Sequence, residues 1–131
     1  MLPMTSFLII CGAILGGTGM FAGTFAAHAV GSICNSPIQI RNWDAAVRSW
    51  LVHSLVILVA GVLSLAPQAS AARGLLTTAG VLFLIGTVLF SGCLAAFAVT
   101  GRTMFAAIAP LGSLALIIGW AVLVWAGCCI H

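Results

Sequence analysis

Two histidines, His28 and His53, are the residues of this chain whose type and spacing could do chemistry. They lie on consecutive apolar segments, and Cys34 lies in the joint between the two. Two imidazoles can ligate a haem iron, and two imidazoles with a thiolate can hold copper or zinc. Because no HxxxH or CxxC spacing fixes their geometry, we predict no metal site and no cofactor, with His28 and His53 as the candidates to check.

Catalysis and proton transport would need ionisable groups that the chain lacks. It carries one acidic residue in all, Asp44, and no Glu. Proton carriers within membranes are usually Asp or Glu, so proton-coupled transport has no acidic residue at membrane depth. We therefore predict no catalytic residue and expect that the protein is not an enzyme.

His53 shares its expected depth in the membrane with three other residues. We expect the same depth for Thr87 and Ser91 on the third apolar run and for Pro110 on the fourth. Pro110 has no N–H and frees a backbone carbonyl, which together with the two hydroxyls can satisfy a neutral imidazole. The sequence predicts a buried polar cluster of these four residues, in which His53 has either a structural role or a functional one.

The elements that must position these residues are four apolar runs, at 4–30, 45–66, 74–99 and 104–130. Hydrophobic residues make up 63% of the chain and charged residues 4%, whereas soluble domains carry roughly 25% charged residues. About 20 apolar residues cross a bilayer as a helix. We predict an all-α integral membrane four-helix bundle, with 1–131 as a single transmembrane domain. The first run exceeds the apolar core of a signal peptide and lacks a basic start, so it is expected to be retained.

The charged residues lie near the joints and give a formal net charge of +3. Nucleic-acid binding is excluded, because it requires a solvated face of clustered Lys and Arg. Asp44 and Arg48 are one helical turn apart, which predicts an interfacial ion pair facing outward. The first joint is expected to span 31–43, with Asn42 or Asp44 capping the second helix.

Glycines form a seam on the first run. Gly12, Gly16, Gly19 and Gly23 fall within about 60° of one another on a helix, which allows close backbone approach. Gly112 and Gly119 repeat the pattern on the fourth run. Both sets are predicted to pack helices together, either within one chain or, as the alternative, between copies.

Four sequence blocks resemble a family of small bacterial membrane proteins called domain of unknown function 423. The blocks are, in chain order, the glycine-rich stretch 12–28 that ends in Ala27-His28, the stretch 43–53, the stretch 86–92, and Pro110-Leu111-Gly112 with Gly119-Trp120. The resemblance covers nearly the whole chain. It implies four transmembrane helices in a bacterial inner membrane and no known activity.

The chain also departs from the family's pattern. Ser49 and Trp50 stand where the family usually has Tyr and Gln, Ala95 replaces a Tyr, and Ala109 replaces a Thr. The loss of these hydrogen-bonding groups around His53 puts a family catalytic or transport site in doubt here. It favours a role carried by shape and packing.

These observations favour a structural or accessory subunit that binds membrane lipids, another membrane protein or a larger membrane complex. A small homo-oligomeric transporter or channel is the alternative, and a haem- or quinone-linked enzyme subunit is the third reading. Polar residues that stop halfway through the membrane argue against a pore. The expected location is the bacterial inner membrane, as a multi-pass protein.

Overall fold

The computed structural model describes residues 3–130, apart from the side chain of Ala27. Its long helices are α1 (Met4–Ile33), α2 (Pro37–Leu63), α3 (Arg73–Thr100) and α4 (Thr103–Cys128), and a short 3-10 turn, η1 (Pro67–Ala69), links α2 to α3. All four long helices are long and apolar enough to cross a membrane. The prediction of an all-α membrane protein with four spans is confirmed. Residues 1, 2 and 131 of the predicted single domain lie outside the described residues.

The joint between α1 and α2 is shorter than predicted. It covers only residues 34–36, because α2 begins at Pro37 and not near residue 45. The Ser36 hydroxyl accepts from the Gln39 N–H at 3.3 Å, and Pro37 fills the first helical position, where a missing N–H costs nothing. Gln39 reaches back to accept the Asn35 N–H at 2.9 Å.

The predicted caps of this helix were therefore wrong. Asn42 and Asp44 lie inside α2, more than a turn beyond its start. The sequence Ser36-Pro37-Ile38-Gln39 is a capping-box pattern with proline at the first helical position, and it marks the observed start. At the other end α2 stops at Leu63, three residues before the predicted end at 66.

A tight turn of two residues, 101–102, joins α3 to α4. Gly101 ends α3 in the left-handed conformation, with φ of 69°. Its N–H donates to the Phe97 carbonyl at 2.7 Å, which closes the last turn of the helix. α4 then begins at Thr103 and continues through Pro110.

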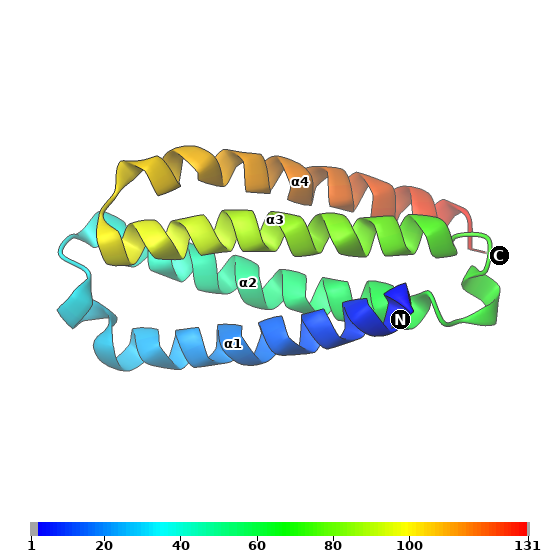
Figure 1. Ribbon diagram of the computed structural model, residues 1–131, viewed down its shortest axis with the longest axis horizontal. Helices are drawn as coiled ribbons and strands as arrows, with labels where there is room; N and C mark the ends of the chain where they lie inside the picture. Colours follow the sequence, from blue (N-terminus) through cyan, green and yellow to red (C-terminus); the bar gives the residue numbers. More distant parts are fainter. Residues whose placement is uncertain (1–2, 131) are drawn as a thin grey trace.

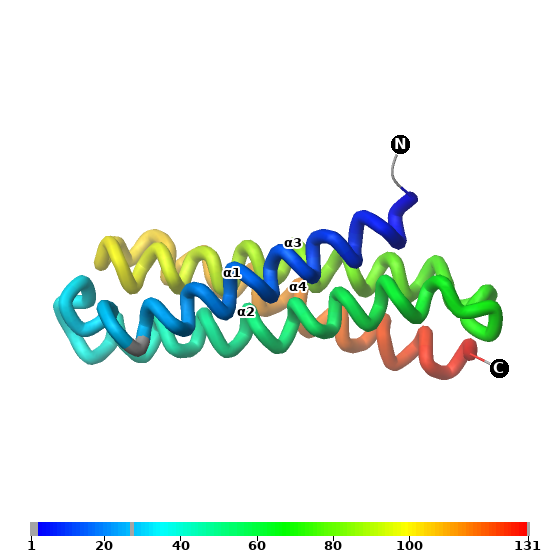
Figure 2. Tube along the Cα trace, turned by 90° about the horizontal axis from the view of Figure 1, so that it is seen from below, coloured from blue at the N-terminus to red at the C-terminus, as the bar shows by residue number. Residues whose placement is uncertain are grey.

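The helices follow one another side by side in chain order (Figure 1). α1 packs on α2, α2 on α3, and α3 on α4, while α1 contacts α3 far less extensively. Figure 2 shows that α1 crosses the other helices obliquely, so that its start lies near α3 and its end lies near α2. We call the end with both termini and η1 the terminal end, and the end with the joints 34–36 and 101–102 the loop end.

The central core draws one large side chain from each helix. Leu8, Ile57, Phe83 and Leu116 are buried together. The Phe83 ring lies edge-on to Trp120 with ring centroids 5.2 Å apart. This packing fixes α1, α2 and α3 to one another at the level of Leu8.

Glycines allow the helices to approach closely at several positions. The α1 glycines face α2: a Cβ added at Gly12 would lie 2.8 Å from Leu58 Cγ, and one added at Gly19 would lie 3.0 Å from Leu51 Cδ2. Gly23 likewise faces Val47 of α2. The seam therefore packs within the chain, which leaves it unavailable for packing between copies.

The closest approach is between α3 and α4. A Cβ added at Gly112 would overlap the Phe90 backbone and lie 2.9 Å from the Gly86 carbonyl oxygen. Gly119 makes room for the Phe83 ring, at 3.1 Å. The sequence correctly placed Gly112 and Gly119 among packing residues. It did not single out Gly86, which faces Gly112.

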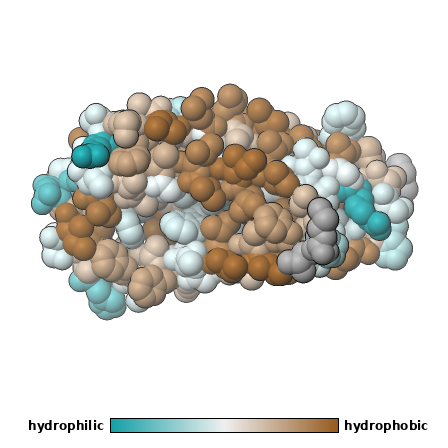
Figure 3. Space-filling model, in the orientation of Figure 1, coloured by the Kyte–Doolittle hydropathy of each residue, from teal (hydrophilic) through white to brown (hydrophobic). Residues whose placement is uncertain are grey.

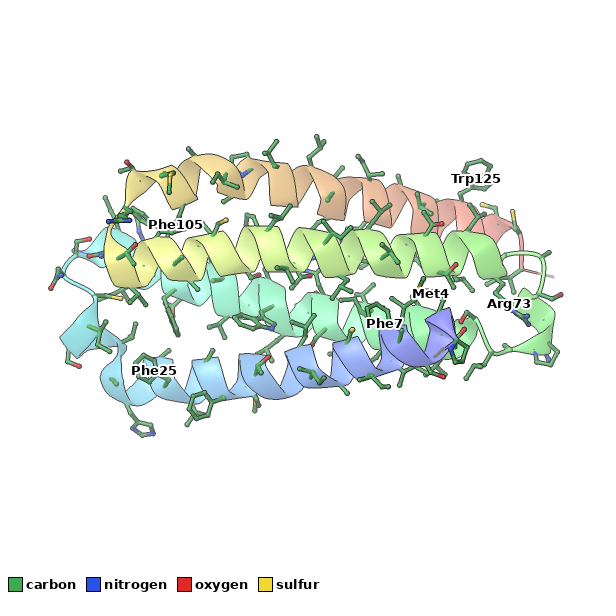
Figure 4. All side chains as sticks on the ribbon, viewed as in Figure 1. Met4, Phe7, Phe25, Arg73, Phe105 and Trp125 are labelled. Atoms are coloured by element: carbon green, nitrogen blue, oxygen red, sulfur yellow. The ribbon has the colours of Figure 1, made fainter. Side chains whose placement is uncertain are left out.

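A small set of polar contacts ties the helices at the terminal end. The Arg73 Nε donates to the Ser64 carbonyl at 3.0 Å, and the hydroxyls of Thr5 and Ser64 lie 3.0 Å apart. Figure 4 places Arg73 beside the link between α2 and α3. These bonds connect α1, the end of α2 and the start of α3.

The outer surface is largely apolar. Figure 3 shows hydrophobic residues over the middle of one face, with the most hydrophilic residues near the two ends. Trp125 is 63% exposed and points away from α4 (Figure 4). This distribution matches a multi-pass membrane protein whose ends lie at the two membrane surfaces.

Candidate functional site

His53 lies among aromatic rings between α2, α3 and α4. Its Nδ1 is 2.7 Å from the Ser49 carbonyl oxygen and 3.1 Å from the Ser49 hydroxyl, both on the same helix. The imidazole centroid lies 5.7 Å from that of Phe83 and 6.2 Å from that of Trp120. The hydrogen bonding of Nδ1 is thus met within α2, and the ring is packed as an aromatic side chain.

The other members of the predicted polar cluster are not joined to His53 by hydrogen bonds within the described residues. The buried Thr87 hydroxyl donates to the Phe83 carbonyl of its own helix at 2.6 Å. Ser91 is 1% exposed and its hydroxyl has no partner in this part of the chain. Pro110 is exposed, which differs from the prediction that it lies in a buried cluster. The proline ring faces outward, while its neighbour Ala109 is buried.

The geometry does not assemble the candidate metal ligands. His28 is exposed on α1, whereas the buried Cys34 thiol donates to the Ala98 carbonyl at 3.3 Å. Burial raises the pKa of the Cys34 thiol, which disfavours the thiolate that a metal would need. Within residues 3–130 no three His, Cys, Asp or Glu side chains are grouped to hold a metal ion. Cys34 instead fastens the α1–α2 joint to the end of α3.

Asp44 and Arg48 both face outward, as predicted, but their contact differs from the predicted ion pair. The Arg48 Nε donates to the Asp44 backbone carbonyl at 3.3 Å. Both side chains are exposed, and no ion pair joins them in the described structure. An exposed guanidinium gains little from a carboxylate that it meets only through solvent.

We expect Asp44→Ala to change the free energy of unfolding by less than about 0.5 kcal/mol, because exposed pairs at this spacing contribute no more than that. Unfolding in mixed detergent micelles measures the difference from wild type. Arg48→Ala, which removes the Nε bond, is the matched variant. A loss of several kcal/mol for Asp44→Ala would show that the carboxylate is buried against a partner.

A groove lies between α1 and α3. Its volume is about 500 Å³, and α2 forms its floor with the indoles of Trp43 and Trp50. Its remaining lining residues are Thr18, Phe21, Ala22, Phe25 and Ile33 of α1 with Ala95 and Val99 of α3. The lining is almost wholly apolar.

A second hollow, of about 140 Å³, lies nearer the middle of α1. It is lined by Leu15 of α1, by Thr87, Val88 and Gly92 of α3, and by Trp50, which borders both hollows. The α1 residues that line the two hollows, from Leu15 to Ile33, extend over about 27 Å of the helix.

The oblique course of α1 and small side chains on its neighbour create this groove. Small residues line the two hollows on both helices and leave space between them. They are Gly92 and Ala95 on α3 and Ala22 on α1. Phe25 and Trp43 contact across one side, with ring centroids 5.7 Å apart, and Figure 4 shows Phe25 on α1 near the loop end.

Two hydrogen-bond donors in the groove floor are unsatisfied. The indole nitrogens of Trp43 and Trp50 are buried and have no acceptor within the described residues. Buried donors without partners are rare in native proteins, and each calls for an explanation. Sequence reasoning did not find the groove. The available signal was the spacing of seven residues between the two tryptophans, which puts both on one face of α2.

Comparisons with known proteins identify relatives along most of the chain. The family model described as protein of unknown function (DUF423) matches residues 22–113. The UPF0382 membrane protein YwdK of Bacillus subtilis is 40% identical over 117 residues, which cover 88% of this chain and 91% of the relative. UPF0382 membrane proteins of Staphylococcus haemolyticus and Staphylococcus epidermidis are 32% and 34% identical, each covering 88% of this chain and 90% of the relative. No solved structure matches the chain.

Proposed function

Because this chain belongs to the DUF423 family of membrane proteins, whose function is unknown, we propose a role that follows from its own groove. The protein is a non-enzymatic accessory component of the bacterial inner membrane. It acts by holding another membrane constituent, a lipid or a partner protein, between α1 and α3. The observation that carries this proposal is the groove of about 500 Å³ floored by Trp43 and Trp50.

The groove is suited to an apolar occupant that arrives from within the membrane. Helix faces in lipid gain nothing from hydrophobic burial alone, so a bound constituent must be held by close packing. Aromatic side chains from α1 and α2 supply large rigid contact surfaces for such packing. Ligand-binding hollows in proteins have about this volume and this apolar character.

The rest of the interior supports binding over transport or catalysis. Ile57, Phe83 and Leu116 fill the space between α2, α3 and α4, where a pore through the chain would have to run. An ion pathway needs polar groups that face a continuous opening. The Thr87 hydroxyl and the His53 Nδ1 bond to their own helices and do not face such an opening.

Filling the groove tests this proposal. Ala95→Phe is expected to place a ring in the hollow and to remove at least about nine-tenths of a bound constituent, since overlapping atoms exclude an occupant. The measurement is the lipid and protein composition of the particle after gentle purification from native membranes. Ala121→Phe, on the exposed surface of α4, is the matched control and should keep the wild-type composition.

Two results would contradict this function. One is a composition unchanged by Ala95→Phe in a variant whose helical content and unfolding match wild type. The other is a turnover or transport activity that His53→Ala abolishes and Ala95→Phe leaves intact.

A further inference from the structure

We propose that His53 binds a membrane-soluble quinol on the side of the bundle where α2 and α4 lie beside α3. This site goes beyond the proposed function, because it is separate from the groove between α1 and α3, to which α4 contributes no residue. Three observations carry it: the position of the proton on the imidazole, the depth of His53 in the membrane, and the aromatic rings beside it.

The hydrogen bond of His53 fixes which ring nitrogen carries the proton. Nδ1 lies 2.7 Å from the Ser49 carbonyl oxygen, and a carbonyl oxygen only accepts, so Nδ1 is the donor. In the neutral imidazole, Nε2 then has no hydrogen and is an acceptor. No donor among the described residues bonds to Nε2, and it is not enclosed by the protein as the indole nitrogens of Trp43 and Trp50 are. His53 therefore presents an open hydrogen-bond acceptor.

Water does not satisfy this acceptor at the depth of His53. The residue lies about 24 Å along α2 from Pro37 and about 15 Å from Leu63. With a hydrocarbon core of about 30 Å centred on this helix, His53 is about 10 Å inside the core. An unpaired polar group costs free energy there, because no water is present to bond to it. The natural partner of Nε2 is consequently a donor that dissolves in the bilayer.

The neighbouring rings favour an aromatic donor. Trp120 is 44% exposed and its ring centroid lies 6.2 Å from that of His53, so a flat ring that bonds to Nε2 can also pack on the indole. The buried Phe83 ring contacts both of these side chains from α3. A phenolic hydroxyl is also more acidic than an aliphatic one and donates more strongly to an imidazole nitrogen.

The surface around Trp120 suits the rest of a quinol. Ile117 and Val124 lie one turn to either side of Trp120 and are both exposed. They offer an apolar surface along α4 to an isoprenoid tail. A quinol combines the three properties that this face requires, which are a hydroxyl donor, a flat ring and a hydrocarbon tail.

The same geometry selects the reduced form of the molecule. A quinol donates through its hydroxyl groups, whereas the carbonyl oxygens of a quinone only accept and cannot bond to an unprotonated Nε2. To donate to a quinone, the neutral imidazole of His53 would have to move its proton from Nδ1 to Nε2 and lose the bond to Ser49. The site therefore binds the quinol by hydrogen bonding and packing, without electron transfer.

Iron ligation is another use of an open imidazole nitrogen, and a haem held by two histidines does not fit. His28 lies about 7 Å from the end of α1 at the loop end, whereas His53 lies about 24 Å from the start of α2 at that same end. The two residues thus differ by about 16 Å in depth. They cannot bind opposite faces of one haem.

Three probes of nearly the same shape test the site on the unmodified protein. Duroquinol has two hydroxyl donors, its dimethyl ether has none, and duroquinone has carbonyl acceptors only. Each probe is dialysed anaerobically against lipid nanodiscs that contain the protein, and empty discs of the same lipid correct for partition. We expect one duroquinol per chain, bound at least about tenfold more tightly than either other probe, because only duroquinol satisfies Nε2.

The imidazole itself gives a second readout. In protein made with isotope-labelled histidine, nitrogen NMR should show Nε2 of His53 without a proton, and duroquinol should shift its resonance while Nδ1 stays protonated. His53→Phe identifies this signal and should lower the affinity for duroquinol to that for the ether. His28→Phe, at an exposed position near the loop end, is the matched control and should keep the wild-type affinity.

Several results would overturn the quinol site. Equal binding of the three probes would show that Nε2 is not the contact. Duroquinol binding that is unchanged in a His53→Phe variant, with wild-type helical content and unfolding, would have the same meaning. A protonated Nε2 in the lipid-embedded protein would contradict its role as an acceptor, and a haem absorbance band that His53→Phe removes would assign the nitrogen to iron. None of these results bears on the groove, which Ala95→Phe tests separately.

Discussion

Gly112→Ala is expected to lower the free energy of unfolding by about 3 kcal/mol, near the upper end of the usual cost of overpacking. The added methyl group would overlap the Phe90 backbone and lie 2.9 Å from the Gly86 carbonyl oxygen. Backbone atoms cannot turn aside as a flexible side chain can. α3 and α4 must therefore separate along the contact in which Leu116 also packs against Gly86. Unfolding in mixed detergent micelles measures the loss.

Gly127→Ala is the matched control on the same helix. A Cβ at this position meets no atom within 4 Å, so alanine should stabilise α4 by up to about 1 kcal/mol through its higher helix propensity. Equal effects of the two substitutions would show that the close contact at Gly112 does not exist. A folded Gly112→Ala variant with wild-type stability would have the same meaning.

Phe83→Ala has the second large expected effect, a loss of about 3 kcal/mol. The ring is fully buried and contacts Gly119 and the rings of His53 and Trp120, so alanine leaves a cavity that three helices border. Comparable substitutions in proteins cost about 3–5 kcal/mol. We expect the lower end because transfer from water contributes little between helices in lipid, which leaves mainly lost packing.

Phe21→Ala provides the comparison for Phe83→Ala. Phe21 is 75% exposed and borders the groove, so its removal should change the free energy of unfolding by less than about 0.5 kcal/mol while weakening retention of the constituent bound in the groove. The two phenylalanines should thus separate stability from binding. A loss of stability at Phe21 as large as that at Phe83 would mean that the groove is closed in the folded protein.

The number and type of the helices could be predicted because composition alone decides them. A chain with 4% charged residues has too few to build a water-facing surface, and only helices can then satisfy the backbone. The helix ends were less predictable. The first joint was expected over 31–43 because Asn42 and Asp44 resemble caps, whereas the capping pattern from Ser36 to Gln39 determines the start of α2.

The partner of each helix face could not be predicted from spacing. The 100° rotation per residue places the glycines of α1 on one face, but Leu51 and Leu58, which meet Gly19 and Gly12, are known only from the structure. The same distances predict the effect of a larger side chain in the seam. Gly19→Leu should disturb α2 more than Gly16→Leu, because the nearest atom to a Cβ lies at 3.0 Å at Gly19 and 3.5 Å at Gly16.

The groove was beyond sequence reasoning for a similar reason. It depends on the oblique course of α1, which a contact between Leu8 and Gly80 far from the groove helps to set. Trp50 and Ala95 stood out in the sequence as departures from the family's pattern. The structure brings both to the groove, on its floor and on one wall.

The serial packing of the helices also governs how the chain can assemble as it leaves the ribosome. Each helix packs mainly on the one made just before it, and α1 and α4 do not form a packed pair. The α1–α2 hairpin can therefore make its glycine contacts during synthesis, and α3 and α4 can be added in turn. Contacts between segments close in sequence form quickly, since little loop-closure entropy is lost before they form. Insertion and folding can thus proceed together from the N-terminus, without a wait for the last helix.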